Sequence, residues 1–353
     1  MAATAAAMTA ETTCPARTEP RRLVIPVFVN PNARANRRNP RLAARLQTIV
    51  GGDGRVLAPR SLDELGQMAG ALRADRPAAI AIHGGDGTLH KTLSALISAW
   101  QEAPLPPVAI LCGGTMNVVA ASLGLQERPA VMLTQLVASL RAGRPLETLR
   151  KRTVKVSDRS GARYGFIFGN GLLANFLTEY YGPNGYGPMR AVWIVLRCIA
   201  SALVRGPFAR RLFRRFEGEV KVDGQPLSWP NFASIGAATV REVGLGFKLN
   251  DRAHDDPDRF GVLAIHAGPL ALLPDLPAVH AGRGISPERA FSTVASTLEV
   301  SSRPESQMTY TIDGDLYHTS APIHVAVGPV IEFVKPQRAL ITKARGDTIT
   351  ELP

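Results

Sequence analysis

Between residues 22 and 144, short apolar runs alternate with stretches in which apolar residues recur at helical spacing. The strands predicted from this pattern are RLVIPVFVN, RVLA, AAIAI and VAILC, and the helices are RLAARLQTIV, SLDELGQMAGALRA and VVAASLGL. The second helix begins with Ser61, and Glu64 follows three residues later, which is a capping-box signature. Near-continuous apolar strands separated by helices are typical of a parallel sheet covered on both faces. This part is therefore predicted to be an α/β domain.

The pattern changes after residue 150 to runs that resemble strands joined by turns. These runs are RTVKVSD, RYGFIFGN, GEVKVDGQPLSW, FASIGAATV, RFGVLAIHAG, STLEVSS, MTYTIDGDLY and PIHVAVGPVIEFVKP. They predict a second, β-rich antiparallel domain with one helical interruption between Met189 and Phe216. We therefore expect a disordered tail and two domains, followed by a C-terminal segment that returns to the first domain. The respective residues are 1–20, 21–147, 148–336 and 337–353.

Composition narrows the class of protein. The chain has 353 residues, is 45% hydrophobic and carries a formal net charge of +12, which favours an anionic partner such as phosphate, nucleic acid or a membrane surface. An arginine-rich proteome would give the same excess without such a partner. The cysteines (Cys14, Cys112 and Cys198) have no metal or redox spacing, which is typical of a reducing compartment. The N-terminal residues lack the features of a signal peptide, and the apolar run 191–204 is too short to span a bilayer. We expect a cytoplasmic protein.

The stretch AIAIHGGDGTLHKTL (residues 79–93) interrupts a buried strand with glycines and a carboxylate. In a parallel sheet, ligands gather where strands end and helices begin. The glycines Gly84, Gly85 and Gly87 allow close approach to the backbone, and the helix that follows favours a phosphate at its N-terminus. Asp86 would be unfavourable beside phosphates unless a metal ion or a substrate hydroxyl lay between them. A simple Asp-Gly reversal is the alternative, but a helical pattern follows instead of a second strand.

Two further strand ends carry polar residues. Gly113 and Gly114 open a turn after VAILC, and Thr115 and Asn117 offer hydrogen bonds before the next helix. The first predicted strand ends in Asn30, Pro31 and Asn32, followed by arginines suited to phosphate.

Four motifs in order resemble those of the diacylglycerol kinase catalytic family, which also contains the sphingosine, ceramide and bacterial lipid kinases. They are Asn30-Pro31, the GGDGT loop from Gly84 to Thr88, the GTxN loop from Gly114 to Asn117, and Asp313-Gly314-Asp315. The resemblance extends from about Leu23 to about Pro336. Any one of these motifs alone would be weak, and Asp313-Gly314-Asp315 alone would indicate only a turn between strands.

The resemblance implies an NAD kinase/diacylglycerol kinase-like α/β domain and an antiparallel β-sandwich, with the active site between them. It implies ATP and Mg²⁺ as cofactors and the primary hydroxyl of a lipid alcohol as the acceptor. Catalytic roles would fall to Asp86, Asp313 as general base, and Asp315, with Asp86 as the metal ligand. Asp315 stands where relatives have glutamate. The implied nucleotide-binding residues are Asn30, Asn32, Gly84, Gly85, Gly87, Thr88, Gly114, Thr115 and Asn117.

The chain departs from the family at two positions. Val118 replaces an aspartate found in many relatives, and Lys91 replaces a glutamate. Sphingoid-type relatives often lack the aspartate too. The change is therefore consistent either with a different lipid acceptor or with a loss of activity. The segment RAHDDPDRFGVL resembles a structural magnesium segment of some bacterial members, but its spacing is inexact and a solvated acidic loop is favoured.

Three other functions compete with an active lipid kinase. NAD kinases share the GGDG loop, but no TPTGSTAY-like segment is present here. Phosphofructokinases share it too, but the β-rich second half does not suit them. A catalytically silent nucleotide- or lipid-binding regulator is supported only by Val118 and Lys91. The sequence indicates no nucleic-acid partner for such a kinase, and it does not determine the lipid acceptor or the oligomeric state.

The segment MRAVWIVLRCIASALVRGPFARRLFRRF (residues 189–216) interleaves apolar residues with arginines. Trp193, Phe208, Leu212, Phe213 and Phe216 could enter a headgroup layer while arginines bind anionic lipid. Alternatively, the apolar residues belong to the core and the arginines form a solvated face. The first interpretation predicts peripheral association with an anionic membrane surface. The arginines considered for this role are Arg205, Arg210, Arg211, Arg214 and Arg215.

Overall fold

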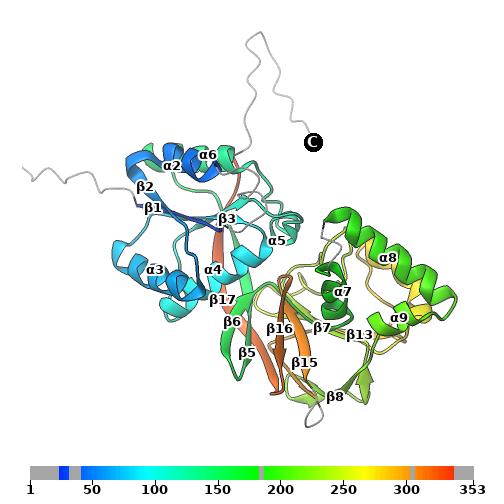
Figure 1. Cartoon of the computed structure of the whole chain (residues 1–353). Coiled ribbons are helices and arrows are strands. Elements are labelled where there is room, and N and C mark those ends of the chain that lie inside the picture. The colour runs from blue at the N-terminus through cyan, green and yellow to red at the C-terminus, as the bar shows by residue number, and fades with distance from the viewer. Residues whose placement is uncertain (1–23, 32–40, 183–186, 303–306, 338–353) are drawn as a thin grey trace, which may run out of the picture.

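The computed structural model describes residues 24–31, 41–182, 187–302 and 307–337 (Figure 1). The predicted tail 1–20 and the predicted segment 337–353, apart from its first residue, lie outside the described residues. No helix in the described part of the chain is both long enough and apolar enough to cross a membrane.

The first domain is a parallel sheet in the order β4-β3-β1-β2 with helices on both faces (Figure 1). Side chains of each strand alternate between two cores, since successive residues point to opposite faces. Phe28 and Ile82 pack with α3 and α4, whereas Val27 and Ala81 pack with α2 and α6. The predicted cap is present: the Ser61 hydroxyl accepts the Glu64 N–H at the start of α3. The elements are β1 Ile25–Val29, α2 Leu42–Val50, β2 Gly54–Leu57, α3 Leu62–Asp75, β3 Ile80–Gly84, α4 Asp86–Ala99, β4 Val108–Cys112, α5 Val118–Ser122 and α6 Pro129–Arg141.

The second domain packs two sheets face to face around an apolar core. One is a six-stranded antiparallel sheet, within the described residues, in the order β13-β12-β11-β7-β15-β16. The other contains β5, β6, β8, β14 and β17, and inward residues such as Val154 and Leu298 meet Phe168 and Tyr310 across the core. The strands are β5 Thr148–Asp158, β6 Gly161–Gly165, β7 Ile167–Gly171, β8 Phe216–Val222, β9 Gln225–Pro226, β10 Asn231–Phe232, β11 Ser234–Ala238, β12 Phe260–Ile265, β13 Ala290–Ala295, β14 Thr297–Ser302, β15 Met308–Ile312, β16 Asp315–Thr319 and β17 Ile323–Val334.

Strand β17 joins the two domains. Most of it pairs antiparallel with β5, and its first part also pairs with β14. Near its end, Phe333 pairs parallel with Val108 of β4, so the sheet of the first domain continues into the second (Figure 1). The chain thus returns to the first domain through β17.

The expectation of a single helical interruption in the second half is wrong. Helix α7 packs on the outer face of the six-stranded sheet, and α8 and α9 pack against α7 (Figure 1). Helices α10 and α11 follow β12. In α7, apolar residues recur at helical spacing (Leu172, Leu173, Phe176, Leu177 and Tyr180), a signal that the neighbouring strand patterns obscure. These helices are α7 Leu172–Tyr180, α8 Pro188–Leu203, α9 Pro207–Leu212, α10 Pro269–Leu272 and α11 Leu276–His280.

Candidate active site

The first motifs meet at the point where the strand order reverses. The chain leaves β1 toward β2 on one side and leaves β3 toward β4 on the other, so the carboxyl ends of β1 and β3 border a crevice. Asn30 follows β1, and its side-chain amide donates a hydrogen bond of 3.0 Å to the Thr88 hydroxyl in the first turn of α4. The structure thus brings the Asn30 and GGDGT motifs together; Asn32 lies outside the described residues.

The two glycine loops touch each other. A Cβ on Gly114 would lie only 2.4 Å from the Gly85 Cα, so the contact requires residues without side chains. Asn117, in the left-handed conformation at φ 48°, accepts a hydrogen bond from the Gly114 N–H and donates one to the Gly114 carbonyl. Both side-chain polar atoms of Asn117 therefore shape the loop.

Asp86 also connects the GGDGT loop to the GTxN loop through hydrogen bonds, a role that was not predicted from the sequence. Its two carboxylate oxygens accept the N–H groups of Val118 and Val119, each at 3.0 Å, at the start of α5. Burial raises the pKa of Asp86, the amide hydrogen bonds offset part of this effect, and the nearby charge of Asp315 adds to it. Asp86 is therefore both a loop-positioning group and a half-buried acid in the cavity.

Asp313 and Gly314 are the central residues of a tight hairpin turn between β15 and β16, with φ of 47° and 91°. The buried Asp313 carboxylate accepts N–H groups of Phe166 and Ile167 at 2.9 and 2.8 Å, between β6 and β7. Burial raises the pKa of Asp313 to about 8; the two N–H groups lower it in part, and the charges of Asp86 and Asp315 raise it further. Such a value lies near neutral pH, where an acid can both accept and release a proton.

Asp315, the first residue of β16, reaches the GGDGT helix. Lys91 Nζ lies 3.1 Å from both of its carboxylate oxygens. A Cβ on Gly87 would lie 2.9 Å from Asp315 Oδ2, so glycine at that position is what admits the carboxylate. The lysine that departs from the family pattern is thus the cationic partner of the third acidic residue.

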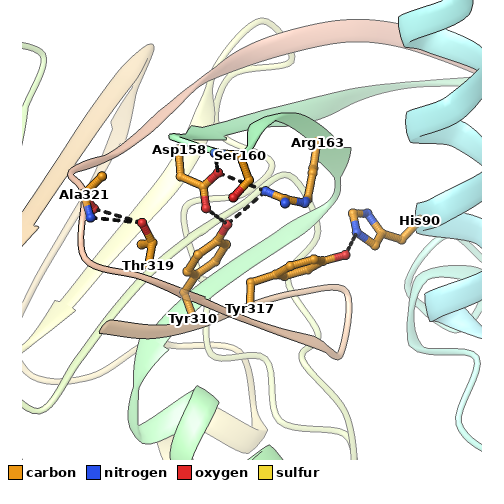
Figure 2. A network of polar contacts seen from close by, with 8 residues as sticks. All are labelled: His90, Asp158, Ser160, Arg163, Tyr310, Tyr317, Thr319 and Ala321. Carbon is orange, nitrogen blue, oxygen red and sulfur yellow. Dashed lines mark hydrogen bonds and ion pairs between the residues drawn. The ribbon is translucent and has the colours of Figure 1, made fainter. Parts of the chain in front are cut away.

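A polar network beside this pair connects α4 to the second domain (Figure 2). Buried His90 donates from Nδ1 to the Tyr164 carbonyl, so its Nε2 accepts the Tyr317 hydroxyl hydrogen at 2.7 Å. Burial lowers the pKa of His90 to about 4, which keeps the ring neutral. Arg163 lies over the Tyr317 ring at 4.5 Å and donates to Asp158. Because Tyr317 and Asp315 point to the same side of β16, this network also positions the carboxylate.

The three carboxylates border one cavity of about 330 Å³ between the domains. Neither Asn117 nor Gly84 lines it; Asn117 shapes its wall instead. The polar or glycine lining residues are Asn30, Gly85, Asp86, Gly87, Thr88, Lys91, Gly113, Gly114, Thr115, Thr311, Asp313, Gly314 and Asp315.

Two further cavities adjoin it. One, of about 210 Å³, shares Asn30, Thr88 and Lys91 with the main cavity and extends toward the start of α3. The other, of about 220 Å³, lies beneath α8, is lined almost wholly by apolar side chains, and shares Met116, Leu173, Phe176 and Val243 with the main cavity. Sequence reasoning did not find this apolar chamber, because its walls come from segments spread between Met116 and Ile285.

The charges of the main cavity suit a metal that is shared with phosphates. In the described part of the chain, no three His, Cys, Asp or Glu residues could hold a metal by themselves. Asp315 Oδ2 is buried and accepts no well-oriented hydrogen bond from the described residues, although Lys91 Nζ lies 3.1 Å from it. Mg²⁺ is commonly held by one or two carboxylates plus substrate phosphates. In the acidic segment, Asp255 and Asp258 instead form ion pairs with Arg252 and Arg152.

Comparison with known proteins shows what the first domain resembles. Residues 25–145 match the sequence model of the diacylglycerol kinase catalytic domain, so the resemblance to this family is confirmed. No curated protein matches the chain.

Solved structures extend the likeness to the second domain. A diacylglycerol kinase from Bacillus anthracis str. Sterne is 14% identical, with a TM-score of 0.55, over 89% of this chain and 97% of that one. A candidate diacylglycerol kinase from the same strain is 16% identical over the same shares, with a TM-score of 0.59. At such identities the likeness establishes the fold, and the predicted fold class is confirmed: an α/β domain with a parallel sheet followed by an antiparallel β domain.

Proposed function

We propose that this protein is a lipid kinase that transfers the γ-phosphoryl group of ATP to a primary hydroxyl of a membrane lipid alcohol. The observation that carries the proposal is the junction of two cavities. Three carboxylates and two glycine loops border one, and the apolar chamber beneath α8 shares four lining residues with it. A substrate with a polar hydroxyl end and an apolar body fits such a pair of spaces.

The glycine loops suit the nucleotide phosphates. Backbone N–H groups at the start of the 14-residue helix α4 favour an anion. The Thr88 hydroxyl accepts from Asn30 and still carries its own proton to donate to a phosphate oxygen. The cavity that extends toward α3 would take the nucleoside, since it shares Asn30 and Thr88 with the phosphate region.

Asp313 has the position and proton affinity for the base. Its carboxylate borders the main cavity, and its raised pKa gives it an affinity for the hydroxyl proton. As the lipid oxygen bonds to the γ-phosphorus, Asp313 accepts the hydroxyl proton, and the bond between that phosphorus and the bridging oxygen breaks to release ADP. A bound Mg²⁺ would be held by Asp86, Asp315 and the phosphates, and would neutralise phosphate charge.

Labelled-phosphate transfer tests the proposal directly. The purified protein would be incubated with γ-phosphate-labelled ATP, Mg²⁺ and detergent-dispersed diacylglycerol, monoacylglycerol, sphingoid base or ceramide, with NAD as a non-lipid acceptor. We expect label in at least one lipid, and a loss of about a hundredfold or more in Asp313→Asn, as removal of a general base produces. Asp223→Asn is the matched control, because Asp223 also precedes glycine in a turn and accepts two backbone N–H groups. Label in NAD alone, or in no acceptor, contradicts the proposal.

A silent nucleotide-binding regulator is the second candidate, and the Lys91–Asp315 ion pair favours it because the lysine already neutralises one carboxylate. Calorimetric titration with ATP and Mg²⁺ separates the two functions. Binding of ATP without transfer to any lipid supports the regulator, whereas binding with transfer supports the kinase.

A further inference from the structure

Helix α8 has apolar side chains on two opposite faces, although it lies at the periphery of the second domain (Figure 1). Ala191, Ile194 and Ala202 face inward and are buried. On the opposite side, Met189, Leu196 and Leu203 follow one another at intervals of seven residues and are 78%, 60% and 64% exposed. A helix that is apolar all round is normally enclosed on every side by protein or lipid. The outer face of α8 therefore favours an apolar environment that the described residues do not supply.

This outer face forms a continuous stripe. Residues seven apart lie almost above one another on a helix, and Val192 and Trp193 fill the interval between Met189 and Leu196. Trp193 is 47% exposed, and the guanidinium groups of Arg190 and Arg197 lie 5.2 and 5.0 Å from its ring. A helix of 16 residues is about 24 Å long, so the stripe extends over almost the whole length of α8.

The charge around the stripe is predominantly positive. Residues 187–216 contain seven arginines and no aspartate or glutamate. Glu179 on α7 pairs with Arg190, Arg197 and Arg211, so one carboxylate serves three cations. A second copy of the chain would bring the same positive charge and repel this face, whereas an anionic bilayer offers both an apolar interior and a complementary charge.

The structure corrects which residues of this segment can enter a headgroup layer. Phe208 and Leu212 are buried against α7 and α8, and Phe213 is half-buried. Arg211 and Arg215 are engaged with Glu179 and Asn231. Of the apolar residues that the sequence suggested for this role, Trp193 on α8 is exposed, whereas Phe208 and Leu212 on α9 are buried. The apolar contact surface therefore lies on α8.

We propose that the outer face of α8 docks the protein on an anionic lipid bilayer, with the docking stripe at the acyl boundary and the arginines among the headgroups. The docking stripe is Met189, Val192, Trp193, Leu196 and Leu203. The inner face of the same helix lines the apolar chamber through Ile194, Cys198 and Ala202. Docking therefore places the apolar chamber directly beneath the helix that contacts the membrane. The choice of substrate rests on the proposed function, but the docking surface does not.

Vesicle sedimentation of the full chain tests the docking surface without relying on catalysis. We expect wild type to sediment with phosphatidylcholine vesicles that contain phosphatidylglycerol, and to be released by high salt. The stripe variant (Met189→Ser, Leu196→Ser, Leu203→Ser) should bind at least tenfold more weakly. In the arginine variant (Arg205→Gln, Arg210→Gln, Arg214→Gln), each lost charge should weaken binding about fivefold, and the three together about a hundredfold.

Matched controls lie on the first domain, where exposed residues of the same types are remote from α8. Val131→Ser replaces an exposed apolar residue of α6, and Arg45→Gln, Arg73→Gln and Arg128→Gln together remove three exposed arginines. These controls should bind vesicles as wild type does. Calorimetric melting verifies that each variant is folded, and the folded stripe variant should phosphorylate detergent-dispersed lipid like wild type if the proposed function holds.

Fluorescence of the wild-type protein tests the docking surface without relying on the multiple variants. Lipids brominated near the headgroup boundary should quench wild-type tryptophan fluorescence. Trp193→Phe should lose most of that quenching, because Trp100 is buried in the first domain and Trp229 is half-buried against His266 and Phe291. Equal vesicle binding by wild type and both folded variants would overturn the proposal. A dimer in analytical ultracentrifugation that the stripe variant abolishes, without vesicle binding by wild type, would overturn it in favour of a second copy.

Discussion

Replacing Asp313 with asparagine should stop phosphoryl transfer. It should also make the protein more stable relative to wild type as the pH rises. The pKa of Asp313 is about 8 in the folded chain because the carboxylate is buried, against 3.8 for the ordinary group. An acid with a higher pKa in the folded state holds its proton more tightly there. The stability that it confers is therefore greatest below the lower pKa and is lost as the pH rises toward the higher one.

The magnitude follows from these two values. Between pH 6 and pH 8, the unfolded chain has Asp313 ionised while the folded chain is still losing the proton, so wild type loses about 2 kcal/mol that the variant does not lose. For a chain of this length, that free energy corresponds to about 3 °C in melting temperature. Asparagine keeps the size of the side chain and can still accept N–H groups of Phe166 and Ile167 through its oxygen.

Scanning calorimetry without nucleotide, at pH 6 and pH 8, measures the effect. The melting temperature of Asp313→Asn minus that of wild type should increase by about 3 °C between the two pH values. In the Asp223→Asn control this difference should stay constant. Burial tends to raise the pKa of Asp223, but the N–H groups of Thr297 and Ser296 and the charge of Arg259 bring it below its usual value, so Asp223 is ionised throughout. An unchanged difference for Asp313→Asn would refute the assignment of a raised pKa, and retained activity would refute its role as base.

Three further substitutions probe the surroundings of Asp315. Lys91→Met should raise the KM for ATP about fivefold. It should change the free energy of unfolding by less than about 1 kcal/mol, because the ion pair with Asp315 is partly exposed. Steady-state kinetics measure the KM and urea unfolding measures the stability, and an unaltered KM would contradict the prediction. Gly87→Ala should lower kcat at least about tenfold, since the new Cβ would contact Asp315 Oδ2. The control is Gly66→Ala in α3, where a Cβ would meet no atom within 4 Å outside its own helix. This control should keep full activity, and its free energy of unfolding should increase by up to about 1 kcal/mol. Val118→Asp should not increase transfer to any lipid, because it adds a third negative charge beside Asp86 and Asp315; a large gain with diacylglycerol would show that an acidic network had been repaired.

Features that depend on neighbouring residues can be predicted from the sequence alone. Apolar runs of strand length and the capping pair Ser61 and Glu64 follow from local periodicity and local hydrogen bonding. The GGDGT and GTxN loops can be recognised as ligand-binding loops, because a glycine turn between a buried strand and a helix has few other functions. The helix α7 was equally local, but its pattern is short and lies directly after a strand.

Contacts between groups that are distant in the sequence follow from the folded arrangement and not from local patterns. Lys91 and Asp315 are 224 residues apart, and their contact depends on the hairpin turn, on Gly87 and on the His90–Tyr317 bond, none of which local periodicity specifies. The same holds for α8, whose two faces are similarly apolar in sequence. Packing buries one face against the domain and leaves the other exposed, since burial depends on the surfaces that the rest of the chain brings to each side.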